Sequence, residues 1–143
     1  MTAMNSKTKE KKATPRRPVE TGVPDPFPHM HPVLKKNYGD WAWHDRPRPG
    51  VLHHVAHGGD EVWTVRAGTQ RQLDVHTIRK LCDIGDEFAE GHVRFTSRSN
   101  IEYMVSTEAQ VAPLIEALNG AGFPVGGTGN SMSMIAHTQG WLH

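Results

Sequence analysis

The sequence has few of the features that would mark a secreted, membrane-bound or thiol-based protein. Its single cysteine, Cys82, excludes an internal disulfide and leaves no cysteine pair for a metal site. No apolar run is long enough for a membrane helix or a signal peptide, so we expect a cytoplasmic protein without membrane contact. The formal net charge is +1 at pH 7, but the basic residues crowd into the first segment, so we expect that the folded part is not a general binder of polyanions.

The composition divides the sequence into four segments. Residues 1–20 are rich in Lys, Arg, Thr and Pro and poor in large apolar side chains, which predicts a disordered basic arm. Residues 21–50 alternate prolines with aromatics, as an extended segment that wraps a partner subunit or packs on its own domain would. Residues 51–125 carry the periodic patterns of a folded half-domain. Residues 126–143 begin with a glycine-rich stretch, whose backbone amides could approach an anion closely.

The folded segment predicts strands and helices in the order β-α-β-β-α. Strands 51–57 and 61–67 would form a hairpin around Gly58–Asp60. A helix begins after Asp74 as its N-cap and ends at Gly91, and a second begins at Thr107, which forms a capping box with Gln110. Two further strands are expected at 92–96 and 101–105. This order indicates an α+β, ferredoxin-like antiparallel sheet with helices on one face and an open second face.

Alternation along two of these strands divides their side chains between the two faces. We expect the apolar set to point at the covering helices; its members are Trp63, Val65, Val93 and Phe95. The opposite set would lie on the open face, with Arg98 just beyond it; its members are Thr64, Arg66, Arg94 and Thr96. Guanidinium groups bind carboxylates and oxyanions through a planar fork of donors, so this face predicts an anionic ligand.

Two other candidate sites receive less support from the pattern. His53 and His54 are adjacent on a strand and therefore point to opposite faces, so we predict no metal site in this chain. Cys82 falls on the apolar stripe of the first helix, where we expect a small buried thiol.

Several separated motifs carry a family resemblance from about Pro32 to the C-terminus. They are Trp63–Arg66, Gly91–Asn100, Gly126–Asn130 and His137–His143, with Lys35–Gly39 and Pro49–Leu52 as further matches. Together they resemble the β subunit of dissimilatory sulfite reductase, in the sirohaem nitrite and sulfite reductase superfamily.

The resemblance implies a six-electron interconversion of sulfite and sulfide, in either direction, at a sirohaem bridged to a [4Fe-4S] cluster. The implied partners are an alpha subunit and a second beta subunit in an α2β2 assembly, with a small sulfur-carrier protein as a further partner. It also implies that the cluster cysteines follow His143, so we expect an N-terminal portion of a subunit that is inactive by itself.

The resemblance also assigns roles to residues of this chain. Arg66 and Arg71 would lie in the sulfite pocket, and Arg94, Thr96, Arg98 and Asn100 would bind sirohaem carboxylates. Thr128, Gly129 and Asn130 would lie beside the macrocycle, and His137, Thr138, Gln139 and His143 near the cluster. Two alternatives remain open: an interaction half-domain without cofactor, and an RNA-binding ferredoxin-like module, which would need stacking aromatics on the open face.

Overall fold

The computed structural model describes residues 25–70 and 72–129. Its five strands form one antiparallel sheet in the order β1-β2-β3-β5-β4. The strands are β1 (Trp41–Arg48), β2 (Val51–Ala56), β3 (Glu61–Gly68), β4 (Val93–Phe95) and β5 (Asn100–Val105). The expected basic arm at 1–20 and the candidate residues Arg71, Asn130, His137, Thr138, Gln139 and His143 lie outside the described residues.

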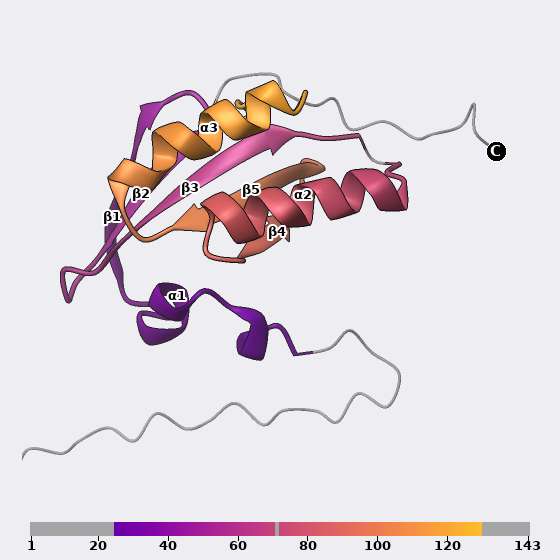
Figure 1. The fold of residues 1–143 in the computed structure, drawn as a ribbon. Coiled ribbons are helices and arrows are strands. Elements are labelled where there is room, and N and C mark those ends of the chain that lie inside the picture. Colours follow the sequence, from indigo (N-terminus) through magenta and orange to yellow (C-terminus); the bar gives the residue numbers. More distant parts are fainter. Residues whose placement is uncertain (1–24, 71, 130–143) are drawn as a thin grey trace, which may run out of the picture.

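Helices α2 (Val75–Phe88) and α3 (Val111–Gly120) lie side by side against one face of the sheet (Figure 1). Shorter helical segments are α1 (Pro32–Lys36) and the 3-10 turns η1 (Phe27–His29) and η2 (Glu108–Gln110). The core between the helices and the sheet contains Trp63, Val65, Ala67, Leu81, Ile101, Tyr103, Val105, Leu114 and Leu118. The predicted α+β ferredoxin-like arrangement is confirmed. None of the helices in the described part of the chain could cross a membrane.

Both predicted helix starts are confirmed, because each is held by the side chain that the sequence indicated. The Asp74 carboxylate accepts a 2.6 Å hydrogen bond from the Thr77 amide at the start of α2. Thr107 and Gln110 form a reciprocal capping box before α3. Satisfying these amides removes the cost of leaving helix-end donors unpaired.

Only part of the apolar stripe predicted for α2, which comprises Val75, Ile78, Leu81, Cys82, Ile84 and Phe88, enters the core. Leu81, Ile84 and Gly85 are buried, whereas Ile78 and Cys82 are exposed. Residues four apart share a helix face, so Ile78 and Cys82 are turned to solvent together while the sheet contacts the neighbouring face. The prediction of a buried Cys82 is therefore wrong.

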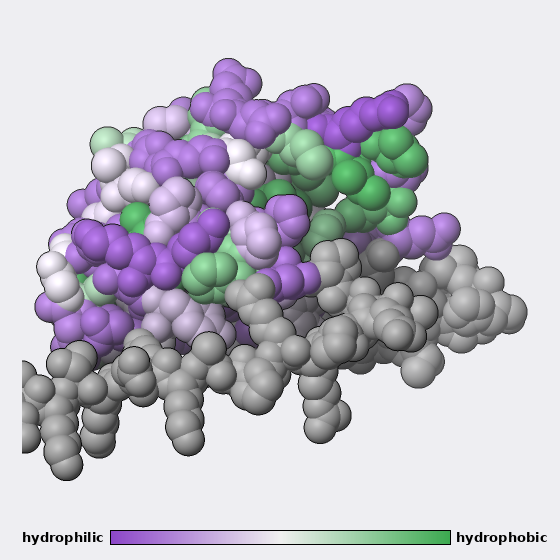
Figure 2. Space-filling model, turned by 90° about the horizontal axis from the view of Figure 1, so that it is seen from below, coloured by the Kyte–Doolittle hydropathy of each residue, from purple (hydrophilic) through white to green (hydrophobic). Residues whose placement is uncertain are grey.

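The two apolar side chains of β4 are also exposed, in contrast to the prediction. Val93 and Phe95 pair with the buried Tyr103 and Ile101, and they share the helix side of the sheet with them. However, β4 is the edge strand, and Phe95 remains 64% exposed. Seen from below, the molecule shows a group of hydrophobic residues gathered at one side of its surface (Figure 2). The predicted face was right, but the cover that would bury these two side chains is absent from the described residues.

β1 supplies an edge strand that the sequence did not predict. It comes from the proline and aromatic segment, and it pairs with β2 through two irregularities, one of which spans Asp45 to Arg48. Pro47 lies inside that irregular part, where its missing N–H removes no regular ladder bond. An edge strand can carry prolines in this way, so this part of the segment packs on its own sheet.

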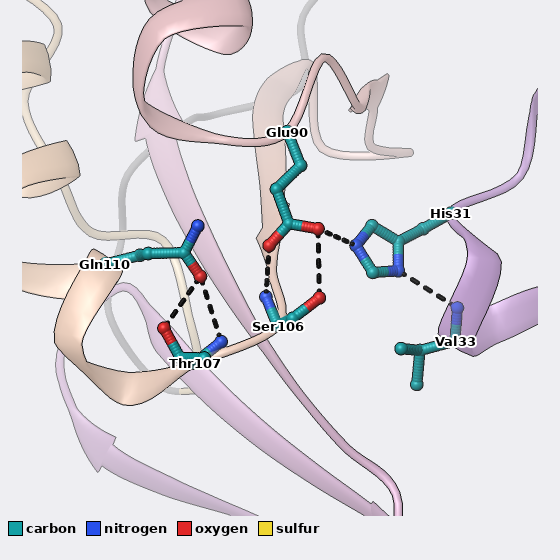
Figure 3. Close-up of polar contacts among 6 residues, drawn as sticks. All are labelled: His31, Val33, Glu90, Ser106, Thr107 and Gln110. Carbon is teal, nitrogen blue, oxygen red and sulfur yellow. Dashed lines mark hydrogen bonds and ion pairs between the residues drawn. The ribbon is translucent and has the colours of Figure 1, made fainter.

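α1 is attached to the end of the sheet through a buried histidine. His31 is 1% exposed, and its Nε2 lies 3.0 Å from Oε2 of Glu90. The Glu90 carboxylate also accepts hydrogen bonds from the amide and the hydroxyl of Ser106, at 2.8 and 2.9 Å (Figure 3). The carboxylate lies between the serine and the histidine, an order that does not activate the serine as a nucleophile. This network therefore fastens α1 to the domain.

Replacing His31 by Gln is expected to reduce the loss of stability that the chain suffers in mild acid. Burial lowers the pKa of His31 below its ordinary value of 6.5, against the opposing influence of Glu90, while nearby His92 also lowers it. The unfolded state therefore binds a proton more readily, so stability is complete above about pH 6.5 and falls as the pH drops below it. Urea unfolding at about pH 7 and about pH 5 measures the difference.

The matched control is His76→Gln, because His76 lies exposed on α2. The control should keep the acid sensitivity of the unaltered chain. Hydrogen bonds to Glu90 lower its pKa below 4.5 despite its burial, so its protonation falls in a lower pH range. An equal loss of stability in His31→Gln and in the unaltered chain would contradict the assignment to His31.

Candidate anion-binding site

The helix-free face of the sheet carries a row of three charged side chains on three adjacent strands. Antiparallel pairing sets Arg66 of β3 opposite Glu102 of β5, and Glu102 opposite Arg94 of β4. Directly paired residues point to the same face of a sheet. Because β5 runs between β3 and β4, the acid lies between the two arginines.

Both oxygens of the Glu102 carboxylate are bonded to guanidinium groups. Oε2 accepts from Nε of Arg66, while Oε1 accepts from Nε of Arg94 at 2.8 Å and lies 2.5 Å from its Nη2. Glu102 is completely buried, whereas the side chains of Arg66 and Arg94 are 20% and 54% exposed. Burying a carboxylate is costly unless it is paired. The two arginines therefore make it possible for this acid to lie inside the sheet.

The arrangement leaves donors free for a ligand. Arg66 gives only its Nε to Glu102, and within the described residues its two terminal nitrogens make no hydrogen bond. Two arginines and one carboxylate leave the row with one net positive charge. When an acid holds the Nε of a guanidinium, the two terminal nitrogens are already oriented for a ligand. This arrangement favours bidentate binding of an oxyanion or a carboxylate.

Two neighbours on the same face add polar groups to the row. Thr64 lies two residues before Arg66, and its hydroxyl is buried without a hydrogen-bond partner in the part of the chain that the structure describes. His54 pairs with Val62 on this face. Burial lowers the pKa of His54, opposed by Glu102 and supported by the positive charges of Arg66 and Arg94. The face therefore carries an imidazole whose uncharged form is favoured, and beneath the surface beside the arginines it contains a buried hydroxyl without a partner among the described residues.

Arg98 belongs to a second group, around the glycine-rich loop. Its Nη1 lies 3.4 Å from the carbonyl oxygen of Gly127 and 3.5 Å from that of Gly129. Thr128 is buried, and its hydroxyl accepts a 2.9 Å hydrogen bond from the Gly50 amide. The structure thus brings together three of the residues that the family resemblance selected, Arg98, Thr128 and Gly129. It also gives Thr128 a structural role in holding the loop.

Thr96 and Asn100 close the turn between β4 and β5. The Thr96 amide donates to the carbonyl of Asn100 at 2.8 Å, and the Asn100 amide donates to the Thr96 hydroxyl at 3.2 Å. Ser99 has a φ of 60°, in the left-handed region that makes a tight turn possible. These contacts set the position of Arg98, which lies inside the turn.

Glu102 is the residue that the sequence reasoning missed. Its position in strand 101–105 predicts the open face, because the residues on either side of it, Ile101 and Tyr103, are apolar. The sequence did contain a signal for Glu102. It is a carboxylate at an open-face position, on the strand that follows the one carrying Arg94. This signal did not reveal that β5 would lie between the two arginines, since only strand order sets that.

The described residues contain no group suited to an iron-sulfur cluster. No three or more His, Cys, Asp or Glu side chains in residues 25–70 and 72–129 lie close enough together to hold a metal ion. Cys82 is exposed on α2, and a four-iron cluster ordinarily takes four thiolates. The donor set of the open face fits anions instead.

Comparisons with known proteins agree with this fold. Residues 54–121 match the family described as the nitrite/sulfite reductase ferredoxin-like half domain. The chain is 43% identical over 141 residues to the "sulfite reductase, dissimilatory-type subunit beta" of Nitratidesulfovibrio vulgaris, an alignment that covers 90% of this chain and 37% of that protein. The corresponding subunit of Archaeoglobus fulgidus is 46% identical over 121 residues, covering 80% of this chain and 33% of the relative. That of Megalodesulfovibrio gigas is 43% identical over 141 residues, covering 90% and 54%.

The fold and these matches define a nitrite/sulfite reductase ferredoxin-like half domain. Within that superfamily, the relatives of the chain are beta subunits of dissimilatory-type sulfite reductases, so the resemblance found in the sequence motifs is confirmed. The chain spans between a third and about half of the length of these relatives.

Proposed function

We propose that this chain serves in a dissimilatory-type sulfite reductase, where its open sheet face binds sirohaem carboxylates and contributes to the sulfite pocket. The row formed by Arg66, Glu102 and Arg94 carries the proposal, because it presents oriented guanidinium donors on the face that no described helix covers. The relatives named above are sulfite reductase subunits, so they favour a role in sulfite reductase over the alternative of an RNA-binding module. Trp63 and Phe95, the aromatics of β3 and β4, lie on the helix side instead.

The donor chemistry of the chain fits sirohaem. The macrocycle carries many carboxylates, which arginine forks bind well. Arg94 and Arg98 are the two arginines that the family resemblance assigned to these carboxylates. Thr96 and Asn100 would act through the turn that carries Arg98. Thr128 and Gly129 would line the edge of the ligand, together with Asn130. Sirohaem, when bound, supplies the iron at which the sulfur oxyanion is reduced.

Arg66 is the best-placed residue for sulfite itself. Its terminal nitrogens are free in the described part of the chain, and a fixed cationic donor stabilises charge that develops as S–O bonds break. His54 on the same face is a candidate for holding or passing a proton. Arg71 remains a second candidate for the pocket, and Thr138, Gln139 and His143 remain candidates for the cluster end. The sequence contains one cysteine, Cys82, so it does not itself supply the four thiolates that a four-iron cluster ordinarily takes.

We further propose that the chain works as part of an assembly with an alpha subunit, a second beta subunit and a small sulfur carrier. The exposed apolar side chains of α2 and β4 support this, because Ile78, Val93 and Phe95 would be buried by a larger structure. The direction of the reaction, reductive or oxidative, depends on electron partners outside the chain.

The substitution Arg94→Ala tests sirohaem binding in a sulfite reductase assembled with this chain. Removing the exposed guanidinium should lower the sirohaem retained after gel filtration severalfold, because a charge-assisted contact to a carboxylate is lost. The visible absorption per mole of complex measures the retained sirohaem. The matched control is Arg79→Ala, since Arg79 lies exposed on α2, on the helix side of the sheet. Unchanged absorption in Arg94→Ala would refute the assignment of this residue.

A further inference from the structure

The β1 edge of the sheet carries an exposed tryptophan that is supported by a stack of rings. Trp43 of β1 is 51% exposed. Its ring meets the ring of His53 edge-on, with centroids 5.3 Å apart, and the His53 ring is stacked on Trp63 of the core with centroids 4.2 Å apart. A large ring that is already held in place loses little conformational freedom when another segment covers it. Trp43 is therefore suited to anchor a contact.

Two carboxylates flank this stack of rings. Asp45 of β1 lies 3.6 Å from Nδ1 of His53, and Glu61 of β3 lies 3.2 Å from its Nε2. A neutral imidazole has one N–H, so it donates to only one of them. Both acids are exposed, and neither forms an ion pair with a lysine or arginine in the described part of the chain. Strand pairing sets Trp43, Asp45, His53 and Glu61 on the helix side of the sheet, and we call them the Trp43 surface.

The charge of the sequence is divided between a basic arm and an acidic remainder. Residues 1–20 contain six lysines and arginines but only two glutamates. The remaining residues contain ten lysines and arginines against thirteen aspartates and glutamates. Arg48 faces the helix side as well, opposite Val51 at the far end of β1. The basic arm and the Trp43 surface are therefore complementary in charge.

The segment that follows the basic arm is attached beside the Trp43 surface. Nζ of Lys36 in α1 lies 2.8 Å from the carboxylate of Asp60, which directly precedes Glu61. The described chain begins at Asp25, and the eight residues that lead to it from Arg17 can span up to about 27 Å. The basic side chains are thus within reach of this surface.

We propose that the basic arm, residues 1–20, docks on the Trp43 surface of the same chain, with its cationic side chains on the indole and beside Asp45 and Glu61. A lysine or arginine is attracted to the face of an indole ring. Each contact at an exposed surface is weak, but a short tether raises the effective concentration of the arm to the millimolar range. α2 also exposes carboxylates, at Asp83 and Glu87, but it contains no tryptophan. The inference does not depend on the proposed function.

A nitroxide spin label on the arm of the full, isotopically labelled chain tests the docking by nuclear magnetic resonance. Cys82→Ser removes the exposed native thiol, and Ala13→Cys supplies the attachment point among the basic residues. The label should broaden the indole N–H signal of Trp43, which Trp43→Phe identifies. The broadening should disappear in about 1 M NaCl, because the screening length falls there to about 3 Å.

Two double variants separate this surface from acidic surfaces in general. Asp45→Asn with Glu61→Gln should reduce the broadening of the Trp43 signal severalfold, because both flanking charges are lost. The matched control, Asp83→Asn with Glu87→Gln, removes two exposed carboxylates from α2 and should leave the broadening unchanged. Circular dichroism checks that each variant is folded.

Three results would overturn the proposal. The first is the absence of broadening at low salt, and the second is equal broadening in the two double variants. The third is broadening in a mixture in which one chain carries the spin label and another carries the isotope, since the arm of a second molecule would then occupy the surface. None of these results bears on the proposed function, because no substituted residue belongs to the row of Arg66, Glu102 and Arg94.

Discussion

Replacing Glu102 by Gln is expected to lower the free energy of unfolding by about 3 kcal/mol, because removing one member of a buried ion pair leaves its partners uncompensated. Glu102 is completely buried and neutralises charge on both Arg66 and Arg94. Without the carboxylate, two guanidinium groups would repel each other across β5. Urea unfolding followed by circular dichroism measures the change.

Two further variants make this result interpretable. Glu87→Gln removes an exposed carboxylate from α2, and it should change stability by less than about 0.5 kcal/mol. Combining Glu102→Leu with Arg66→Met and Arg94→Met should restore most of the loss, since apolar replacement of a whole buried ionic group is often neutral. A Glu102→Gln variant as stable as the unaltered chain would show that the row is not electrostatically coupled.

Replacing Arg66 by Ala in an assembled sulfite reductase containing this chain is expected to lower sulfite turnover roughly a hundredfold, a typical cost of losing one donor to a developing oxyanion. Sirohaem should remain bound, because Arg94 and Arg98 are unchanged. Arg66 supplies the terminal nitrogens that are free in the described part of the chain, whereas Arg94 commits both Nε and Nη2 to Glu102. Steady-state turnover and visible absorption measure the two properties separately.

The conservative variant Arg66→Lys distinguishes charge from geometry. Lysine keeps the positive charge but lacks the planar fork, so its turnover should lie between those of Arg66→Ala and the unaltered enzyme. Arg79→Ala serves again as the control with an exposed arginine. Full turnover in Arg66→Ala would remove this residue from the sulfite pocket.

Local patterns were sufficient to predict most of the secondary structure. The alternation along 61–67 correctly sets Trp63 and Val65 in the core, because side chains of a strand point alternately to its two faces. The capping residues Asp74 and Thr107 correctly mark the helix starts, because a cap depends on residues within one turn. These features are local, so a single sequence contains them.

The errors concern residues whose surroundings come from distant parts of the chain. Leu81 and Ile84 of α2 pack in the core with Tyr103 of β5, whereas Cys82, the residue after Leu81, is turned to solvent. Phe95 has the parity of a core residue but lies on an edge strand. In both cases the hydrophobic pattern was present, but burial depended on where the sheet ended.

The sequence by itself determined most of the strands and helices, with β1 as the exception, and it determined which faces of β3 and β4 carry arginines and which family the motifs resemble. Only the tertiary structure decided that β5 would run between β3 and β4 and bring Glu102 between Arg66 and Arg94. It likewise brought β1 beside the glycine-rich loop, where the Arg46 guanidinium lies close to Gly129 and Nη1 of Arg98 lies 3.5 Å from the carbonyl oxygen of Gly129. The physical reason is that side-chain alternation is a property of one strand, whereas the charge that a guanidinium meets depends on strand order and on contacts between residues far apart in the chain.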